Sequence, residues 1–233
     1  MAVGTQFSVL VTRLRAALRR STSVAVGVDD LDSLKQTLNQ HYDLLYAQHD
    51  WPHLKKVFDL ELVATERYYD LPTGLNPDRI EAVDVNWSGT RHPVRQGIGL
   101  TEMEAFDSDA TVPEQSEPAL RYDIRWTGTS TQIEVWPIPS TGDQTLRFRG
   151  VQAITPLVND ADTCLLDDTL VVLYAAAELA AGAGAKDAEF KAQAAREYLQ
   201  KLKGRGATNA VYRLGLGDQR TELPHRIVVR VGS

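Results

Sequence analysis

Apolar residues recur at helical spacing through the C-terminal part of the chain. Between Leu165 and Leu179 they fall on every side of the predicted helix, which is typical of a helix buried by several neighbours. From Lys186 to Lys203 they form one stripe with Phe190 beside it, so the second helix is predicted to be amphipathic. Because glycines commonly follow helix ends, we expect Gly182 to separate the two helices and Gly204, with the glycine two residues later, to end the second.

The N-terminal residues show two further helical patterns. The first covers Thr5 to Arg20. The second begins after Asp29 or Asp30, either of which can cap it, and runs to about His49. The Trp51-Pro52 pair ends this helix, since the residue before a proline avoids the helical region.

From Lys55 onward the apolar period changes from helical to alternating, which predicts strands. A short helix from Thr101 to Phe106, capped by Thr101 with Glu104 three residues later, interrupts them, and an exposed acidic loop follows at 107–118. The last three strands follow one another across short turns and predict an antiparallel meander. The seven predicted strands are residues 57–64, 67–71, 80–87, 91–96, 121–126, 132–135 and 146–149.

The order helices, strands, helices predicts an α+β fold. We expect a helical bundle layer built from residues 1–50 and 159–204. An antiparallel β-domain of residues 51–158 is inserted between its two halves. Residues 205–233 show no helical period and are predicted to form an extended C-terminal arm.

Charge separates this arm from the rest of the chain. The 233 residues carry 25 basic and 31 acidic side chains, a net charge of −6. Five arginines against Asp218 and Glu222 give residues 205–233 a charge of +3, which leaves −9 on residues 1–204. The acidic body does not favour nucleic-acid binding, and no apolar run has the roughly 18 residues of a membrane span. The arginines suit pairing with carboxylates on a partner, although a merely solvated tail has the same composition.

The sequence predicts no catalytic residue, no cofactor site and no metal site, and therefore no enzyme. His49 and His53 have the spacing of metal ligands, but Pro52 lies between them and no third ligand is near. The single Cys164 borders a leucine-rich stretch and is predicted to be buried rather than reactive. Four tryptophans could form a sugar- or base-binding platform, but packing in the sheet core is the stronger expectation for Trp51, Trp87, Trp126 and Trp136.

Three stretches together resemble the head-to-tail adaptor, or connector, proteins of tailed bacteriophages, including the tail tubular protein A type of short-tailed phages. The resemblance covers roughly residues 30–203. It rests on Leu31-x2-Leu34-x3-Leu38-x3-Tyr42 leading to Trp51-Pro52, on Ile133 to Pro139 before Leu146-Arg147-Phe148-Arg149-Gly150, and on the helix start Leu165-Leu166-Asp167-Asp168.

The resemblance implies a structural virion protein at the head–tail junction, made in the cytoplasm of the host bacterium. Such adaptors form a ring, usually of twelve copies, between the portal protein and a tail protein of the nozzle or tail-tube kind. Genomic DNA passes through the ring without specific binding, and no membrane is involved. An acidic body agrees with this role, because a basic channel would bind phosphates.

In this family the C-terminal region commonly reaches the portal, which makes the arm the candidate portal interface. Its arginines would supply salt-sensitive contacts and its apolar residues anchors. The candidate residues are Arg213, Leu214, Leu216, Arg220, Arg226, Ile227, Val229 and Arg230. Two other functions remain open from the residues alone: a β-sandwich module that binds carbohydrate or another small ligand, and a soluble chaperone or scaffold.

Overall fold

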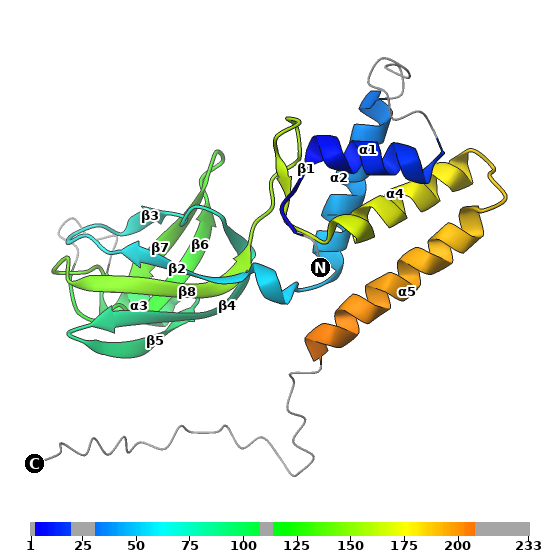
Figure 1. The fold of residues 1–233 in the computed structure, drawn as a ribbon. Coiled ribbons are helices and arrows are strands. Elements are labelled where there is room, and N and C mark those ends of the chain that lie inside the picture. The colour runs from blue at the N-terminus through cyan, green and yellow to red at the C-terminus, as the bar shows by residue number, and fades with distance from the viewer. Residues whose placement is uncertain (1–2, 20–30, 108–113, 208–233) are drawn as a thin grey trace, which may run out of the picture.

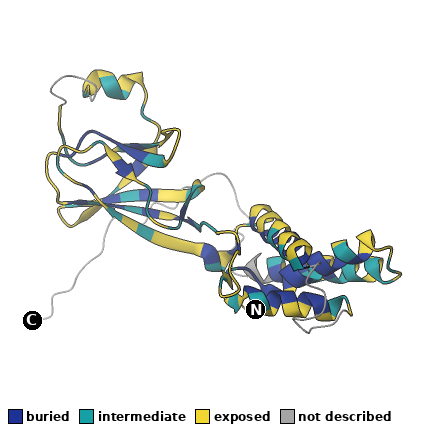
Figure 2. Cartoon of the chain, turned by 90° about the horizontal axis from the view of Figure 1, so that it is seen from above, coloured by how far each residue is buried: buried dark blue, intermediate teal, exposed yellow. Residues whose placement is uncertain are grey.

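The computed structural model describes residues 3–19, 31–107 and 114–207 of the chain. Helices gather at one end of the described chain and a curled sheet at the other (Figure 1). Burial follows this division, since the inner sides of the helices and the inside of the sheet are dark in Figure 2. The α+β fold predicted from the sequence is therefore confirmed.

Four helices form the helical layer: α1 (Phe7–Ala17), α2 (Leu31–Gln48), α4 (Asp168–Gly182) and α5 (Ala188–Ala207). Helix α4 contacts α1, α2 and α5, which explains its apolar residues on every side. A two-stranded ribbon of β1 (Thr5–Gln6) and β9 (Thr163–Cys164) ties the start of α1 to the approach to α4. The prediction of a helix buried by several neighbours is confirmed.

Two predictions about α5 are wrong. Gly204 does not end the helix, which continues to Ala207, because a glycine weakens a helix by only about 1 kcal/mol relative to alanine and does not forbid it. Phe190, predicted to lie beside the apolar stripe rather than in solvent, is 75% exposed. The stripe that packs on the core consists of Ala195, Leu199 and Leu202.

Seven strands form one sheet in the order β2-β8-β4-β5-β6-β7-β3. All neighbours are antiparallel except β5 and β6, which pair in parallel. Inward-facing apolar residues, among them Val85, Ile133 and Phe148, form a core separate from that of the helices. The strand bounds are β2 (Lys55–Glu61), β3 (Tyr68–Asp70), β4 (Leu75–Trp87), β5 (Thr90–Gln96), β6 (Arg121–Trp126), β7 (Thr131–Trp136) and β8 (Gln144–Gln152).

The predicted meander of the last three strands is wrong in its third member. β6 and β7 form the expected hairpin, but β8 leaves it and pairs with β2 and β4. Pro137 and Pro139 lack the N–H groups that a continuing ladder needs, so the chain departs from β7 at this point. The apolar alternation of β8 shows which side of the strand is buried, but it does not specify the neighbouring strands.

The short helix α3 (Leu100–Ala105) begins one residue earlier than predicted, and its cap differs. The backbone N–H of Gly99 donates to Glu102 Oε2 at 3.0 Å, so Gly99 and Glu102, rather than Thr101 and Glu104, occupy the capping positions. Of the predicted acidic loop, residues 108–113 lie outside the described residues. In the following segment, Gln115 forms an isolated bridge to Ile138.

Candidate assembly surfaces

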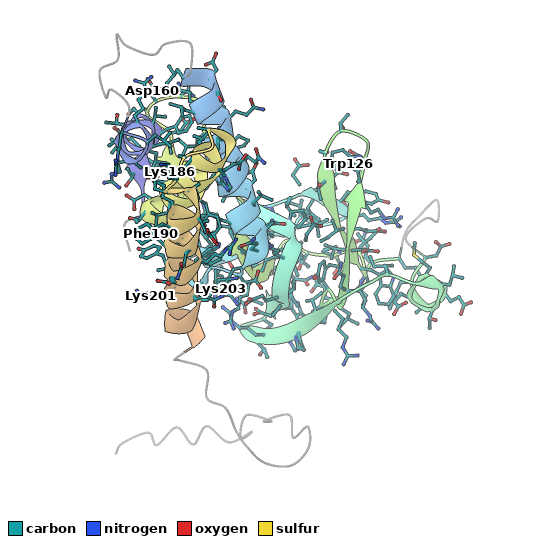
Figure 3. The ribbon with its side chains drawn as sticks, turned by 90° about the vertical axis from the view of Figure 1, so that its right-hand side faces the viewer. Trp126, Asp160, Lys186, Phe190, Lys201 and Lys203 are labelled. Carbon is teal, nitrogen blue, oxygen red and sulfur yellow. The ribbon has the colours of Figure 1, made fainter. Side chains whose placement is uncertain are left out.

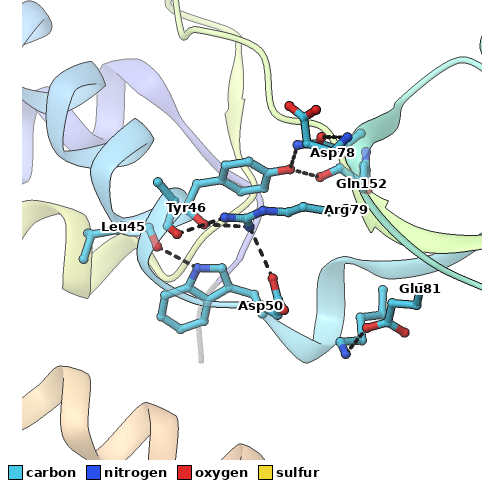
Figure 4. Close-up of polar contacts among 11 residues, drawn as sticks. Leu45, Tyr46, Asp50, Asp78, Arg79, Glu81 and Gln152 are labelled. Atoms are coloured by element: carbon cyan, nitrogen blue, oxygen red, sulfur yellow. Dashed lines mark hydrogen bonds and ion pairs between the residues drawn. The ribbon is translucent and has the colours of Figure 1, made fainter. Parts of the chain in front are cut away.

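An arginine joins the sheet to the helical layer. Arg79 of β4 donates from Nη1 to the Tyr46 carbonyl and from Nη2 to the Ala47 carbonyl, both at 2.9 Å (Figure 4). These carbonyls belong to the last turn of α2, where the helix dipole favours a positive charge. The guanidinium lies 4.5 Å from the Tyr46 ring centroid and 3.5 Å from Asp50 Oδ1. Arg79 thus caps α2 from the other part of the molecule.

The same junction involves β8. The Tyr46 hydroxyl donates to the Gln152 carbonyl at 3.1 Å and accepts from Asn76 Nδ2 at 2.7 Å (Figure 4). A Cβ at Gly150 would lie 3.0 Å from the Arg79 carbonyl oxygen, so only glycine lets β8 approach the irregular part of β4 this closely. The glycine that ends the Leu146–Gly150 motif therefore helps to place Arg79 against α2.

We predict that Arg79→Met lowers the free energy of unfolding by about 1–3 kcal/mol, because methionine keeps apolar contact with Tyr46 but leaves two helix-end carbonyls without their charged donor. Arg91→Met is the matched control. Arg91 pairs with Asp84 on the exposed sheet face, so its replacement should cost roughly 0–1 kcal/mol. Urea unfolding of both variants measures the difference, and equal costs would contradict a special role for Arg79.

The predicted acidic helix start of α4 is a structural junction of the helices. Asp167 caps α4 by accepting from the Leu170 N–H at 3.0 Å, and the Tyr198 hydroxyl of α5 donates to its other oxygen at 3.3 Å. Asp168 is fully buried, ion-paired with Arg13 and bonded to Thr5. Burial alone would raise the pKa of Asp168, but the bonds from Thr5 and Arg13 outweigh it and lower that pKa. Both carboxylates are occupied in joining helices.

The four tryptophans lie in different surroundings, all within the described residues. Trp136 and Trp51 are buried, but Trp51 packs in the helical core rather than in the sheet. The ring N–H of Trp87 donates to Glu117 Oε2 at 2.8 Å. Trp126, at the β6–β7 hairpin, is 69% exposed, which contradicts the expectation that it packs in the sheet core. A shared ligand platform is therefore not formed by these side chains.

The histidines and the cysteine that the sequence analysis weighed as possible site residues make packing contacts instead. His53 Nε2 lies 2.7 Å from the Leu165 carbonyl, and the His49 ring meets Trp51 edge-on. Within the described ranges no group of three or more His, Cys, Asp or Glu residues is placed to hold a metal ion. Cys164 is buried as predicted, and burial raises its pKa to about 12.

No helix in the described part of the chain is both long and apolar enough to cross a bilayer.

The predicted portal interface lies outside the described residues, so the structure brings none of its members together. Within the described part there are two candidate contact surfaces. One is the hairpin with the exposed Trp126, and the other is an apolar groove between α2, α4 and α5 that the sequence analysis did not single out. The alternation of apolar and polar residues predicted the strand that carries Trp126, but it also predicted that the Trp126 ring is buried in the core. The predicted portal-interface residues, which all lie outside the described part, are Arg213, Leu214, Leu216, Arg220, Arg226, Ile227, Val229 and Arg230.

A protein-family model described as SU10 adaptor protein matches residues 5–226, nearly the whole chain. One similar solved structure is titled "Neck of empty GTA particle computed with C6 symmetry". The chain is 17% identical to it, over 76% of this chain and 80% of the other, with a TM-score of 0.26, which is too low to support a conclusion about assembly. No curated protein is similar enough to this chain to count as a relative.

Proposed function

The chain belongs to the SU10 adaptor protein family, and on this premise we propose that it forms a ring that joins the portal at the capsid vertex to the tail. The family match confirms the predicted resemblance to phage adaptor proteins, and it extends beyond residues 30–203 at both ends. This match is the observation that carries the proposal. The proposed place of action is the head–tail junction of the virion, after synthesis in the host cytoplasm.

The structure supports a mechanical role. Arg79 and Tyr46 connect the helical layer to the sheet through side chains from α2, β4 and β8. An adaptor has to hold two dissimilar partners at a constant spacing, and a hydrogen-bonded junction of this kind suits that requirement. The acidic pair at the start of α4, Asp167 and Asp168, joins helices. We accordingly propose a structural rather than an enzymatic function.

We propose three partners for the chain: the portal, a tail protein of the nozzle or tail-tube kind, and other copies of itself. A ring of twelve copies remains the proposal for self-assembly. The net charge of −9 on residues 1–204 supports a channel that DNA crosses without binding, since phosphates are repelled by acidic surfaces and held by basic ones. Because α5 continues to Ala207, the proposed portal contact begins beyond it rather than at residue 205. Residues 208–233 carry four arginines against Asp218 and Glu222, a charge of +2.

Reconstitution tests this proposal. Purified full-length chain is mixed with portal-bearing heads that lack it, sedimented, and imaged by electron microscopy. We expect the chain to co-sediment and to add a ring of density at the portal vertex. Heads assembled without portal protein are the control and should not bind it. Binding to both kinds of head, or to neither, would contradict the proposed role.

A further inference from the structure

The sheet has an open edge at β2. Among the described residues β2 pairs with β8 on one side only, so its other side is free. The free side of an edge strand presents backbone N–H and C=O groups that can pair with a further strand. Lysine and proline often protect such edges, and residues 57–61 of β2 contain neither, since Lys55 and Lys56 lie at its start. β2 therefore offers an edge for strand addition.

The inward-facing side chains of β2 are incompletely covered. Phe58 and Leu60 point toward the core of the sheet, where they lie opposite Phe148 and Leu146 of β8. The two β8 side chains are fully buried, whereas the two β2 side chains are only half-buried. A strand on the free side of β2 would cover this remaining apolar surface, in the same way that β2 covers β8. The edge therefore fits an extended segment with apolar residues at alternate positions.

The outward-facing side of β2 is acidic toward its end. Asp59 is already held by Arg147, whose Nε and Nη2 donate to its two oxygens at 2.6 and 2.8 Å. Glu61, two residues later, is exposed and has no ion-pair partner within the described residues. Val57 on the same side is 52% exposed. A fitting segment would bring a basic residue to Glu61 and leave Asp59 with its arginine.

The end of the arm has this pattern. Residues 226–231 read Arg-Ile-Val-Val-Arg-Val, so apolar residues occupy one side and two arginines lie on the other. In an antiparallel pairing the isoleucine lies beside Leu60 and the second valine beside Phe58, which places Arg226 beside Glu61. Antiparallel pairing continues the arrangement of β2 with β8, and opposite charges on directly facing residues stabilise such a pair.

The length of the connecting chain favours a second copy over the same molecule. Burial lowers the pKa of His49, and the charges of Lys203 near the end of α5 and Lys55 at the start of β2 lower it further, so both lysines lie near this ring (Figure 3). Helix α5 ends at Ala207. Within one molecule, residues 208–225 would thus form a structureless loop between neighbouring points, and loops of this length are uncommon in compact domains. The same length suits a crossing to another copy.

We propose that residues 226–231 of one copy add as an antiparallel strand to β2 of the next copy in the ring. This contact rests on the proposed ring, and it leaves residues 208–225 of the arm for the portal. Residues 1–204 carry −9 and Arg205 makes this −8 for residues 1–207, against +2 on residues 208–233, so the arm reduces the repulsion between neighbouring bodies. A head-to-tail contact of this kind closes into a ring when its rotation divides a full turn. Losing it also weakens portal attachment, because a ring binds through many copies at once.

Two single-cysteine chains test whether the strand crosses between copies. Val57→Cys places a thiol on the outward side of β2, and Val228→Cys places one at a diagonal position of the added strand, roughly 7–8 Å away. The two full-length chains are mixed in equal amounts, assembled on portal-bearing heads and treated with a short bismaleimide cross-linker. The native Cys164 is buried and its pKa is raised to about 12, so it should not react. We expect covalent dimers from the mixture and none from either chain alone.

A charge exchange tests the register. Arg226→Glu in the Val228→Cys chain should reduce the dimers about fivefold or more, because it replaces an opposite-charge pair by a like-charge pair. Adding Glu61→Arg to the Val57→Cys chain should restore them, since the pair is then reversed rather than lost. Glu104→Arg is the matched control, because it makes the same change of charge at an exposed position of α3; it should not restore the dimers.

Four results would overturn the contact. Rings seen by electron microscopy without dimers from the mixture would leave the ring standing and reject this interface. A cross-link within the chain that carries both cysteines, without dimers from the mixture, would place the segment on its own sheet. Equal restoration by Glu61→Arg and Glu104→Arg would reject the proposed pairing of strands. Absence of any ring on the heads would reject both the contact and the proposed function.

Discussion

Replacing Leu170 by aspartate should prevent the chain from folding. Leu170 is fully buried in α4, among residues of α1, α2 and α5, and the acidic Asp167 and Asp168 precede it. The substitution removes about 2–5 kcal/mol of apolar packing and buries a carboxylate without a partner near other negative charges. Because domains are stable by only about 5–15 kcal/mol, the expected loss is comparable to the whole. Circular dichroism and thermal unfolding measure it.

Two further substitutions test how the loss of stability depends on the burial of the replaced side chain. Leu173→Asp, at a half-buried position of the same helix, should give a folded protein with a clearly lowered melting temperature. Glu197→Gln, on the exposed side of α5 where Glu197 accepts from Gln193 at 3.0 Å, should cost about 0.5 kcal/mol or less. A Leu170→Asp chain that folds while the Leu173→Asp chain does not would show that the core of the helical layer is misplaced.

Removing residues 208–233 should abolish most attachment to the portal while leaving folding intact. The last described residue of α5 is Ala207, and both hydrophobic cores are made of described residues that precede the deletion. The removed segment carries four arginines, Arg213, Arg220, Arg226 and Arg230, against Asp218 and Glu222. Thermal unfolding should agree with the full chain, whereas co-sedimentation with portal-bearing heads should fall to background.

A charge-reversed arm separates electrostatic from apolar contacts. Arg226→Glu with Arg230→Glu should weaken attachment strongly at low salt and less at high salt, because exposed charge pairs are screened. Ile227→Ser with Val229→Ser should weaken it at both salt concentrations. A truncated chain that unfolds far earlier would place the arm in the sheet of its own molecule. Undiminished sedimentation of the truncated chain would place the portal contact elsewhere.

Sequence periodicity predicted most helices and strands because burial on one side imposes it. Helix α4 was recognisable from apolar residues on all sides, and it has packed neighbours on several. Strand partners were less predictable: the alternation of Leu146 and Phe148 shows which side is buried, but not that β8 lies between β2 and β4. Glycine was also an unreliable sign of a helix end, because Gly204 lies inside α5.

The Arg79 junction and the exposure of Trp126 were harder to predict because they depend on residues far apart in sequence. Arg79 meets the end of α2 across about thirty positions, and Gly150 has to be small for that approach. Trp126 continues the buried alternation of Tyr122 and Ile124, yet the hairpin extends past the core before the ring is reached. No local sequence motif marks either feature, because each depends on how far the strands and helices extend in three dimensions.

A localised electron-microscopy reconstruction of the neck in intact virions would test whether this chain is the head-to-tail adaptor. We expect a ring between portal and tail whose repeating unit fits the helical layer and the curled sheet together. A neck in which portal and tail meet without density for this chain would contradict the account.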